Sequence, residues 1–111
     1  MDRLFSRYIR TKADWTCGRC GIRVEPPTNY IQCSHYHSRM ARSVRFNEDN
    51  ADCLCAGCHR FFETRKTVEY RDWKKKKLGH VRFTKLEKNY VRLQAGGWTQ
   101  KEKEAMIKKW Q

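Results

Sequence analysis

The sequence predicts a small protein of the α+β class, and three observations lead to that prediction. The chain has 111 residues, which is the length of one domain. A segment of strand-favouring residues, 30–36, lies between segments whose apolar residues recur with helical spacing. The six cysteines include two CxxC pairs, a spacing typical of zinc ligands. We therefore expect a bound metal ion to stabilise this small core.

Most predicted elements lie before residue 79. Residues 3–12 are expected to form a short basic helix, because their apolar side chains fall on one side. The strand at 30–36 follows a turn at 25–29, which contains two prolines and an asparagine. Two further helices are expected at 56–65 and 67–78.

The last third of the chain carries two helix-start signals. Thr84 with Glu87, and Thr99 with Glu102, each have the spacing of a capping box. Gly96-Gly97 is expected to end the first of these helices. The sequence therefore predicts a hairpin of two short helices.

The predicted boundary between two parts of the chain follows a run of lysines. Residues 1–78 are expected to form the zinc-bound unit with its basic N-terminal helix. Residues 79–111 are expected to form a helical extension within the same compact body. The run Lys74–Lys77 is interpreted either as a hinge between them or as a solvated helix end.

The charge of the chain indicates a polyanionic partner. Lysine and arginine number 25 against 12 acidic residues, which gives a net charge of +13, and basic proteins of this size typically bind nucleic acid. No run of about 18 apolar residues exists to span a membrane. The stretch MDRLFSRYIRTK lacks the apolar region of a secretory signal. We therefore expect a cytoplasmic protein, in the host cell if a phage encodes it, with no membrane partner.

The cysteines predict a structural zinc site. Cys17 and Cys20 form one CxxC pair and Cys55 and Cys58 the other, so four thiolates can surround one ion as a tetrahedron. Two alternatives remain open: Cys53 replaces Cys55, or the thiols form a disulfide framework, which a reducing cytosol disfavours. Zinc binding to small domains supplies folding free energy on the order of 10 kcal/mol.

Between and after the cysteine pairs lies an ordered set of polar residues. The stretch IQCSHYHSRMARSVRFNEDNADCLCAGCHRFFE contains His35, His37, Asn50 and, directly after CxxC, His59. It resembles the HNH nuclease motif, in which a β-hairpin and a helix clasp one catalytic divalent metal (the ββα-metal fold, similar to a treble clef). The combination CSHYHSR with RF-x-x-D-N also resembles the phage NinG and Rap recombination endonucleases and related small phage HNH proteins. The resemblance covers roughly residues 15–65.

The resemblance implies a role for each of three residues. His35 corresponds to the general base that activates water, Asn50 to the asparagine that holds the loop carrying the base, and His59 to the metal ligand on the helix. Since four thiolates leave zinc no open position, the implied catalytic ion is a second one, Mg²⁺ or Mn²⁺.

One position departs from the family pattern. Many members have an aspartate ligand where this chain has Ser34, so another ligand is required. His37 lies two residues after His35 and would share its side of an extended strand. Glu63 lies four residues after His59 and would share its helix face. Either side chain, or water and phosphate oxygens, is expected to complete the site.

The expected activity is metal-dependent hydrolysis of DNA, which the resemblance extends to branched recombination intermediates. RNA is the alternative polymer, and a second copy of the chain or a phage protein is the expected protein partner. The alternative function is a non-catalytic zinc-dependent nucleic-acid-binding module or phage accessory protein. Guanidinium groups match phosphate oxygens, and the predicted phosphate contacts are Arg39, Arg42, Arg45 and Arg60.

Overall fold

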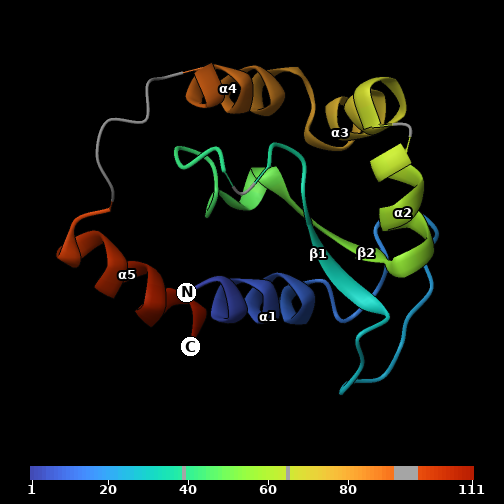
Figure 1. Ribbon diagram of the computed structural model, residues 1–111, viewed down its shortest axis with the longest axis horizontal. Coiled ribbons are helices and arrows are strands. Elements are labelled where there is room, and N and C mark those ends of the chain that lie inside the picture. Colours follow the sequence, from blue (N-terminus) through green and yellow to red (C-terminus); the bar gives the residue numbers. More distant parts are fainter. Residues whose placement is uncertain (39, 65, 92–97) are drawn as a thin grey trace.

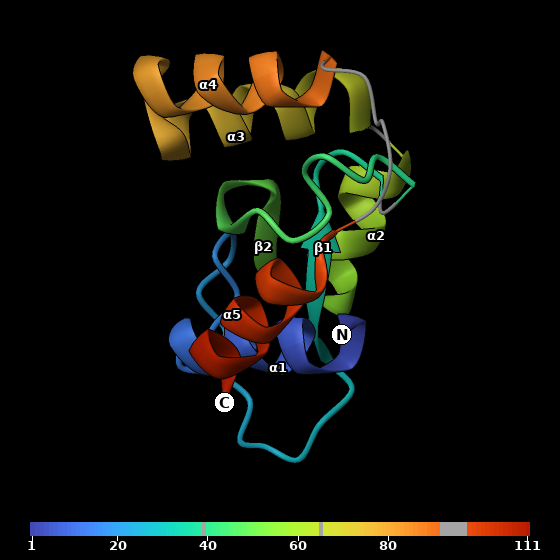
Figure 2. The ribbon, with the colours of Figure 1, turned by 90° about the vertical axis from the view of Figure 1, so that its left-hand side faces the viewer.

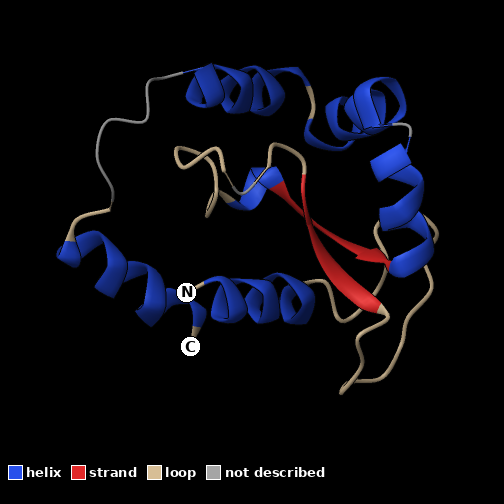
Figure 3. Cartoon of the chain, viewed as in Figure 1, coloured by secondary structure: helices blue, strands red, loops and turns tan. Residues whose placement is uncertain are grey.

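The computed structural model describes residues 1–38, 40–64, 66–91 and 98–111 (Figure 1). Helices surround a two-stranded antiparallel sheet, so the predicted α+β class is confirmed (Figure 3). In chain order the elements are α1 (Asp2–Lys12), β1 (Ile31–His35), the short η1 (Glu48–Asn50), β2 (Ala51–Cys55), α2 (Ala56–Thr64), the π-helical turn η2 (Lys66–Tyr70), α3 (Arg71–Leu78), α4 (His80–Val91) and α5 (Gln100–Trp110).

The β-hairpin is the centre of the fold. Ile31 pairs with Cys55 and His35 with Ala51, and a long loop, 36–50, connects the two strands. Every residue of β2 is buried. Both α1 and α2 pack against the two strands, which accounts for that burial. The short strand predicted at 30–36 is thus present, one residue shorter at each end.

The main core joins the first and last helices to the hairpin. Phe5 of α1 is fully buried, and its ring centroid lies 4.9 Å from that of Trp110 in α5. Ile31 and Leu54 from the strands and Phe62 from α2 belong to the same cluster. Burying side chains of this size contributes about 1.5–3 kcal/mol each. Figures 1 and 2 show α1 and α5 on one side of the hairpin and α3 and α4 on the other.

The predicted C-terminal helical hairpin is corrected by the packing. In the described part of the chain, α4 packs mainly on α3 and η1, whereas α5 packs on α1. Helix α4 begins at His80, directly after Gly79, whose φ of 81° ends α3. Thr84 therefore lies inside α4 and does not cap it. The capping box at Thr99 is confirmed, and Gly96-Gly97 lies outside the described residues.

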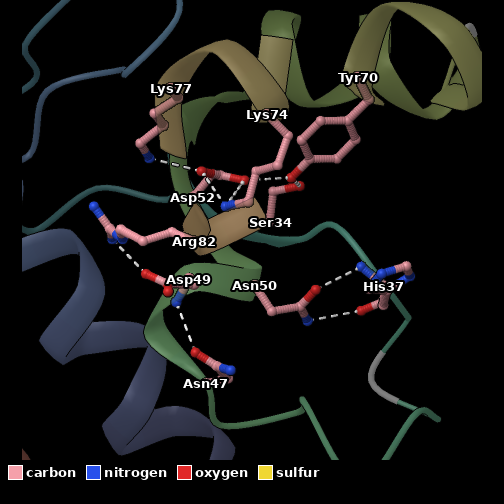
Figure 4. Close-up of polar contacts among 10 residues, drawn as sticks. All are labelled: Ser34, His37, Asn47, Asp49, Asn50, Asp52, Tyr70, Lys74, Lys77 and Arg82. Atoms are coloured by element: carbon pink, nitrogen blue, oxygen red, sulfur yellow. Dashed lines mark hydrogen bonds and ion pairs between the residues drawn. The ribbon is translucent and has the colours of Figure 1, made fainter. Parts of the chain in front are cut away.

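A buried ionic network fastens α3 to the hairpin (Figure 4). The Lys74 ammonium lies 2.9 and 3.0 Å from the two carboxylate oxygens of Asp52, and both residues are at most 1% exposed. Lys77 and the Tyr70 hydroxyl also donate to this carboxylate, at 2.7 and 2.8 Å. Burial lowers the pKa of Lys74, and the adjacent Asp52 opposes that shift. The buried Lys74 therefore connects α3 to β2 through Asp52, and it is neither a hinge nor a solvated helix end, the two roles considered from the sequence.

Candidate functional site

The four predicted zinc ligands lie together. One ligand atom from each of Cys17, Cys20, Cys55 and Cys58 is within 4.8 Å of the others, and the Sγ atoms of Cys20 and Cys55 are 3.8 Å apart. A tetrahedron with Zn–S bonds of about 2.3 Å has sulfur atoms about 3.8 Å apart. Both the donor set and the spacing fit a zinc ion, so the predicted partition of the cysteines is confirmed.

Local backbone geometry brings the two pairs together. Cys17 and Cys20 lie on a tight turn in which Gly21 adopts a φ of 80°, a conformation that favours glycine. Cys55 ends β2 and Cys58 lies in the first turn of α2. The zinc site therefore joins the N-terminal turn to the junction between strand and helix.

Hydrogen bonds reach three sulfurs of the cluster; they lower the pKa of Cys17, whereas burial raises the pKa of Cys58 to about 12. The amides of Cys20 and Cys58 donate to the sulfurs of Cys17 and Cys55, each at 3.4 Å. Burial alone would raise the pKa of Cys17, but the surrounding amide hydrogen bonds outweigh it and lower that pKa to about 6. The Arg19 guanidinium donates to the Cys58 sulfur at 3.4 Å and offsets part of the negative charge of four thiolates.

The other two cysteines are not zinc ligands. Cys33 and Cys53 face each other across the hairpin, outside the four-sulfur cluster. Burial raises the pKa of Cys33 to about 12 and that of Cys53 to about 11. The position of Cys53 outside the four-sulfur cluster, and not its pKa, removes it as a replacement for Cys55.

A cleft of about 590 Å³ opens between α1, β1 and α2. It brings His35 of β1 together with His59 and Glu63 of α2, a strand and a helix that the sequence alone did not place side by side. Its lining consists of Asp2, Ser6, Arg10, Asn29, Ile31, Gln32, Cys33, His35, Ser38, His59 and Glu63.

His35 stands at the end of β1 with a defined ring orientation. Its Nε2 lies 3.1 Å from the backbone oxygen of Arg45. A carbonyl oxygen can only accept a hydrogen bond, so Nε2 carries the proton. In the neutral ring Nδ1 is then the basic nitrogen. His35 thus has the tautomer that a general base requires.

His59 has the opposite tautomer, which a chain of hydrogen bonds determines. The Gln32 amide nitrogen donates to the backbone oxygen of Asn29 at 3.2 Å, so the Gln32 amide oxygen faces His59. That oxygen lies 2.6 Å from His59 Nδ1, which must therefore be the donor. His59 Nε2 then carries the lone pair, 3.3 Å from Oε1 of Glu63.

Two acceptor atoms this close need a cation between them. Either a second proton on His59 or a metal ion satisfies that requirement, and the imidazole and carboxylate are ordinary ligands of divalent metals. Within the described residues, the four cysteines form the sole group of three or more potential protein ligands. His59 and Glu63 therefore offer two protein ligands, and an ion bound there would take its other ligands from water or phosphate oxygens.

Asn50 holds the loop that follows His35. Its buried side chain accepts a hydrogen bond from the His37 amide at 2.8 Å and donates to the His37 carbonyl at 3.0 Å (Figure 4). This is the loop-holding geometry that the family resemblance implies for the asparagine.

His37 itself points away from the cleft. Its Nε2 lies 2.7 Å from the Glu87 carboxylate, and its ring stacks on Tyr90 with centroids 3.7 Å apart. The strand ends at His35, so the alternation that was expected to place both histidines on one side does not extend to residue 37. Glu63, and not His37, accompanies His59 in the cleft.

The predicted phosphate contacts have different surroundings. Arg42 and Arg60 are exposed. Arg45 forms a two-point ion pair with Asp2, and its Nε donates to that carboxylate at 2.9 Å, so contact with DNA would require this pair to open. Arg39 lies outside the described residues.

Sequence reasoning missed three features of this region. Ser34 is 2% exposed and lies 2.9 Å from the Tyr70 hydroxyl, on the Asp52 side of the hairpin. Gln32 orients His59, and Arg10 lines the cleft from α1. The sequence does contain one signal for the first two features: period-two alternation places Gln32 and Ser34 on the same side of β1. No local signal connects Arg10 with a cleft formed by later residues.

The fold and the site define a small α+β protein with a cluster of four cysteines whose geometry fits a zinc ion, and with a cleft lined by His35 and His59. The family model described as "NinG: Bacteriophage Lambda NinG protein" matches residues 1–111, and the chain belongs to this phage protein family. Comparison with curated proteins and with solved structures gives no match. Among the described residues, the helices are too short or too polar to cross a membrane.

Proposed function

We propose that this NinG-family chain is a metal-dependent HNH endonuclease with a ββα-metal core that hydrolyses DNA phosphodiester bonds. The observation that carries the proposal is the cleft that His35 lines together with the His59–Glu63 pair. A base for water and ligands for a cation are the two requirements of this hydrolysis.

In the proposed mechanism, Nδ1 of His35 takes a proton from a water molecule. The water oxygen bonds to phosphorus, and the bond from phosphorus to one sugar oxygen breaks. That oxygen keeps the electron pair and is protonated by solvent. The Arg45 carbonyl holds the imidazole in the tautomer that accepts the proton, and Asn50 maintains the loop behind it.

His59 and Glu63 are the proposed ligands for Mg²⁺ or Mn²⁺. When bound, such an ion would polarise the phosphate and stabilise the leaving oxygen. Gln32 keeps Nε2 of His59 available to it by accepting a hydrogen bond from Nδ1–H. The zinc ion has a structural role, since its four sulfur ligands complete a tetrahedron.

DNA is the proposed partner because the chain has a net charge of +13 and exposes arginines on the loop between the strands and on α2. Arg42 and Arg60 are the exposed members of the predicted set. Binding through phosphate contacts implies weak sequence preference and strong dependence on salt. The family resemblance favours junctions and flaps, the structures that recombination produces.

The second candidate is a zinc-dependent DNA-binding module without chemistry. It is favoured by Ser34, which replaces the aspartate of many HNH proteins and is hydrogen-bonded to Tyr70 away from the cleft. Only two protein ligands then remain for a catalytic ion. This candidate predicts DNA binding that neither His35→Ala nor any divalent metal alters.

The two candidates are separated by a cleavage assay. Labelled linear, flap and four-way-junction DNA is incubated with the zinc-loaded protein in Mg²⁺, Mn²⁺ or EDTA. We expect metal-dependent cutting that His35→Ala abolishes while DNA binding persists. The matched control is His80→Ala, at an exposed histidine of α4. Tight binding without cutting in any metal would overturn the nuclease proposal and favour the binding module.

A further inference from the structure

One face of α1 forms a wall of the candidate cleft. Asp2, Ser6 and Arg10 all line it, and their spacing of four residues places them on one side of a helix. Helix α1 also packs on both strands of the hairpin. The position of this face relative to His35 and His59 is therefore determined by the core.

Arg10 is held in place without being neutralised. Its Nε donates to the backbone oxygen of Ser6 at 3.2 Å, and its guanidinium carbon lies 4.8 Å from the centre of the Trp15 ring. Both contacts restrict the side chain. Neither involves a carboxylate, so the full positive charge is retained.

Among the charged residues that the structure describes around the cleft, Arg10 is a cation with no ion pair. Asp2 is paired with Arg45, and Glu63 faces His59. Within the described part of the chain, Arg10 has no carboxylate oxygen within the 4.0 Å of an ion pair. A guanidinium of this kind is suited to a phosphate, which it can bind through two parallel N–H donors.

We propose that Arg10 binds the phosphate that is cleaved, contacting a non-bridging oxygen opposite the His59–Glu63 pair. Phosphate hydrolysis concentrates negative charge on these oxygens as water attacks, and a preorganised cation stabilises that charge most strongly in the transition state. The proposal rests on the proposed nuclease function and adds a catalytic residue from outside the segment that resembles the HNH motif.

The test compares Arg10→Ala and Arg10→Lys with Arg7→Ala. Arg7 is an exposed arginine of the same helix that lines a different pocket, beside Tyr8 and Trp110. Cleavage is measured under single-turnover conditions at saturating enzyme, and DNA binding is measured separately in EDTA. Zinc content and melting temperature establish that each variant is folded.

We expect Arg10→Ala to lower the single-turnover rate by about 10²-fold and to weaken DNA binding by a smaller factor. Arg10→Lys should recover part of the rate, added guanidinium ion should restore part of the activity of Arg10→Ala, and Arg7→Ala should retain wild-type cleavage. Equal rates and equal affinities for Arg10→Ala and Arg7→Ala would overturn the proposal.

If the chain is not a nuclease, the cleavage and binding measurements give a different pattern. The wild type would then bind DNA and cut under no condition, and the catalytic role of Arg10 would be overturned with it. Loss of affinity in Arg10→Ala alone would then identify a phosphate contact in a binding cleft. A folded wild type that cuts while all three variants also cut normally would reject Arg10 and leave the nuclease function standing.

Discussion

Nε2 of His59 lies 3.3 Å from Oε1 of Glu63, and the other ring nitrogen, Nδ1, donates a hydrogen bond to the Gln32 amide oxygen. The two facing atoms are separated by little more than the distance between adjacent ligands of a small divalent ion. Of the two side chains expected to complete the site with His59, Glu63 lies beside it, whereas the His37 imidazole is bound to Glu87.

Glu63→Gln should weaken Mn²⁺ binding by about tenfold or more, because it removes a charged oxygen ligand for a hard cation. Free Mn²⁺ in a titration of the zinc-loaded protein can be followed by electron paramagnetic resonance. Glu69→Gln, at an exposed glutamate of η2, provides the control. Equal Mn²⁺ affinity for the two variants would exclude Glu63 as a ligand.

Cys20→Ala should release zinc and unfold the chain, since it removes one of four thiolates from a site that contributes folding free energy directly. Cys33→Ala removes a thiol outside the cluster and should keep a full equivalent of zinc. Metal analysis after gel filtration, together with circular dichroism, makes the comparison. Zinc loss from Cys33→Ala would contradict the assignment of the ligands.

Lys74→Met should lower the free energy of unfolding by about 3 kcal/mol, because it leaves the buried Asp52 carboxylate with less compensation. Lys77 still donates to Asp52 and limits the loss. Lys75→Met, at an exposed neighbour in α3, should change stability by less than about 0.5 kcal/mol. Chemical denaturation measures both, and equal stabilities would show that the buried pair contributes nothing.

Asn50→Ala should destabilise the chain by roughly 2 kcal/mol, since it leaves the partly buried backbone amide and carbonyl of His37 without their partners. Cleavage should fall further than DNA binding, because the affected loop supports His35. Asn50→Asp keeps one acceptor and should fall between the wild type and the alanine variant. A melting temperature unaffected by either change would disprove this role.

Acid should weaken the attachment of α5 to the rest of the fold. Burial alone would raise the pKa of Glu48, but hydrogen bonds from Lys109 and Lys12 outweigh it and lower that pKa below its ordinary value of 4.5. The contribution of Glu48 to stability is therefore fully present above pH of about 4.5 and declines as the pH falls through the lowered pKa. Glu48→Gln should flatten this part of the stability profile measured by thermal unfolding, and an unchanged profile would contradict it.

The sequence predicted the features that depend on residues close together in the chain. Two CxxC pairs identified all four zinc ligands, and the position of His59 after Cys58 placed it on α2. Contacts between distant segments were not accessible in this way. Arg10 lines the cleft only because α1 packs on the hairpin. Asp52 forms its ion pair with Lys74 only because α3 lies against the hairpin.

The errors have a similar origin. Thr84 has the spacing of a helix cap, but Gly79 ends the preceding helix first, so α4 starts four residues earlier. His37 follows the end of a strand whose length the pattern overestimated. The position of Gly79 therefore decided where α4 begins, and the end of β1 at His35 decided the direction of His37.

Cys58 and His59 are consecutive residues of α2, so the thiolate centre and the candidate catalytic ion share one turn of helix. Loss of zinc would release the first turn of α2, which carries the candidate ligand His59. Zinc supply would then set the fraction of molecules competent for any chemistry in the cleft, whatever the concentration of magnesium. The sulfur site would also attract soft metals away from its oxygen- and nitrogen-containing neighbour, which would let a single short helix hold two ions of different character.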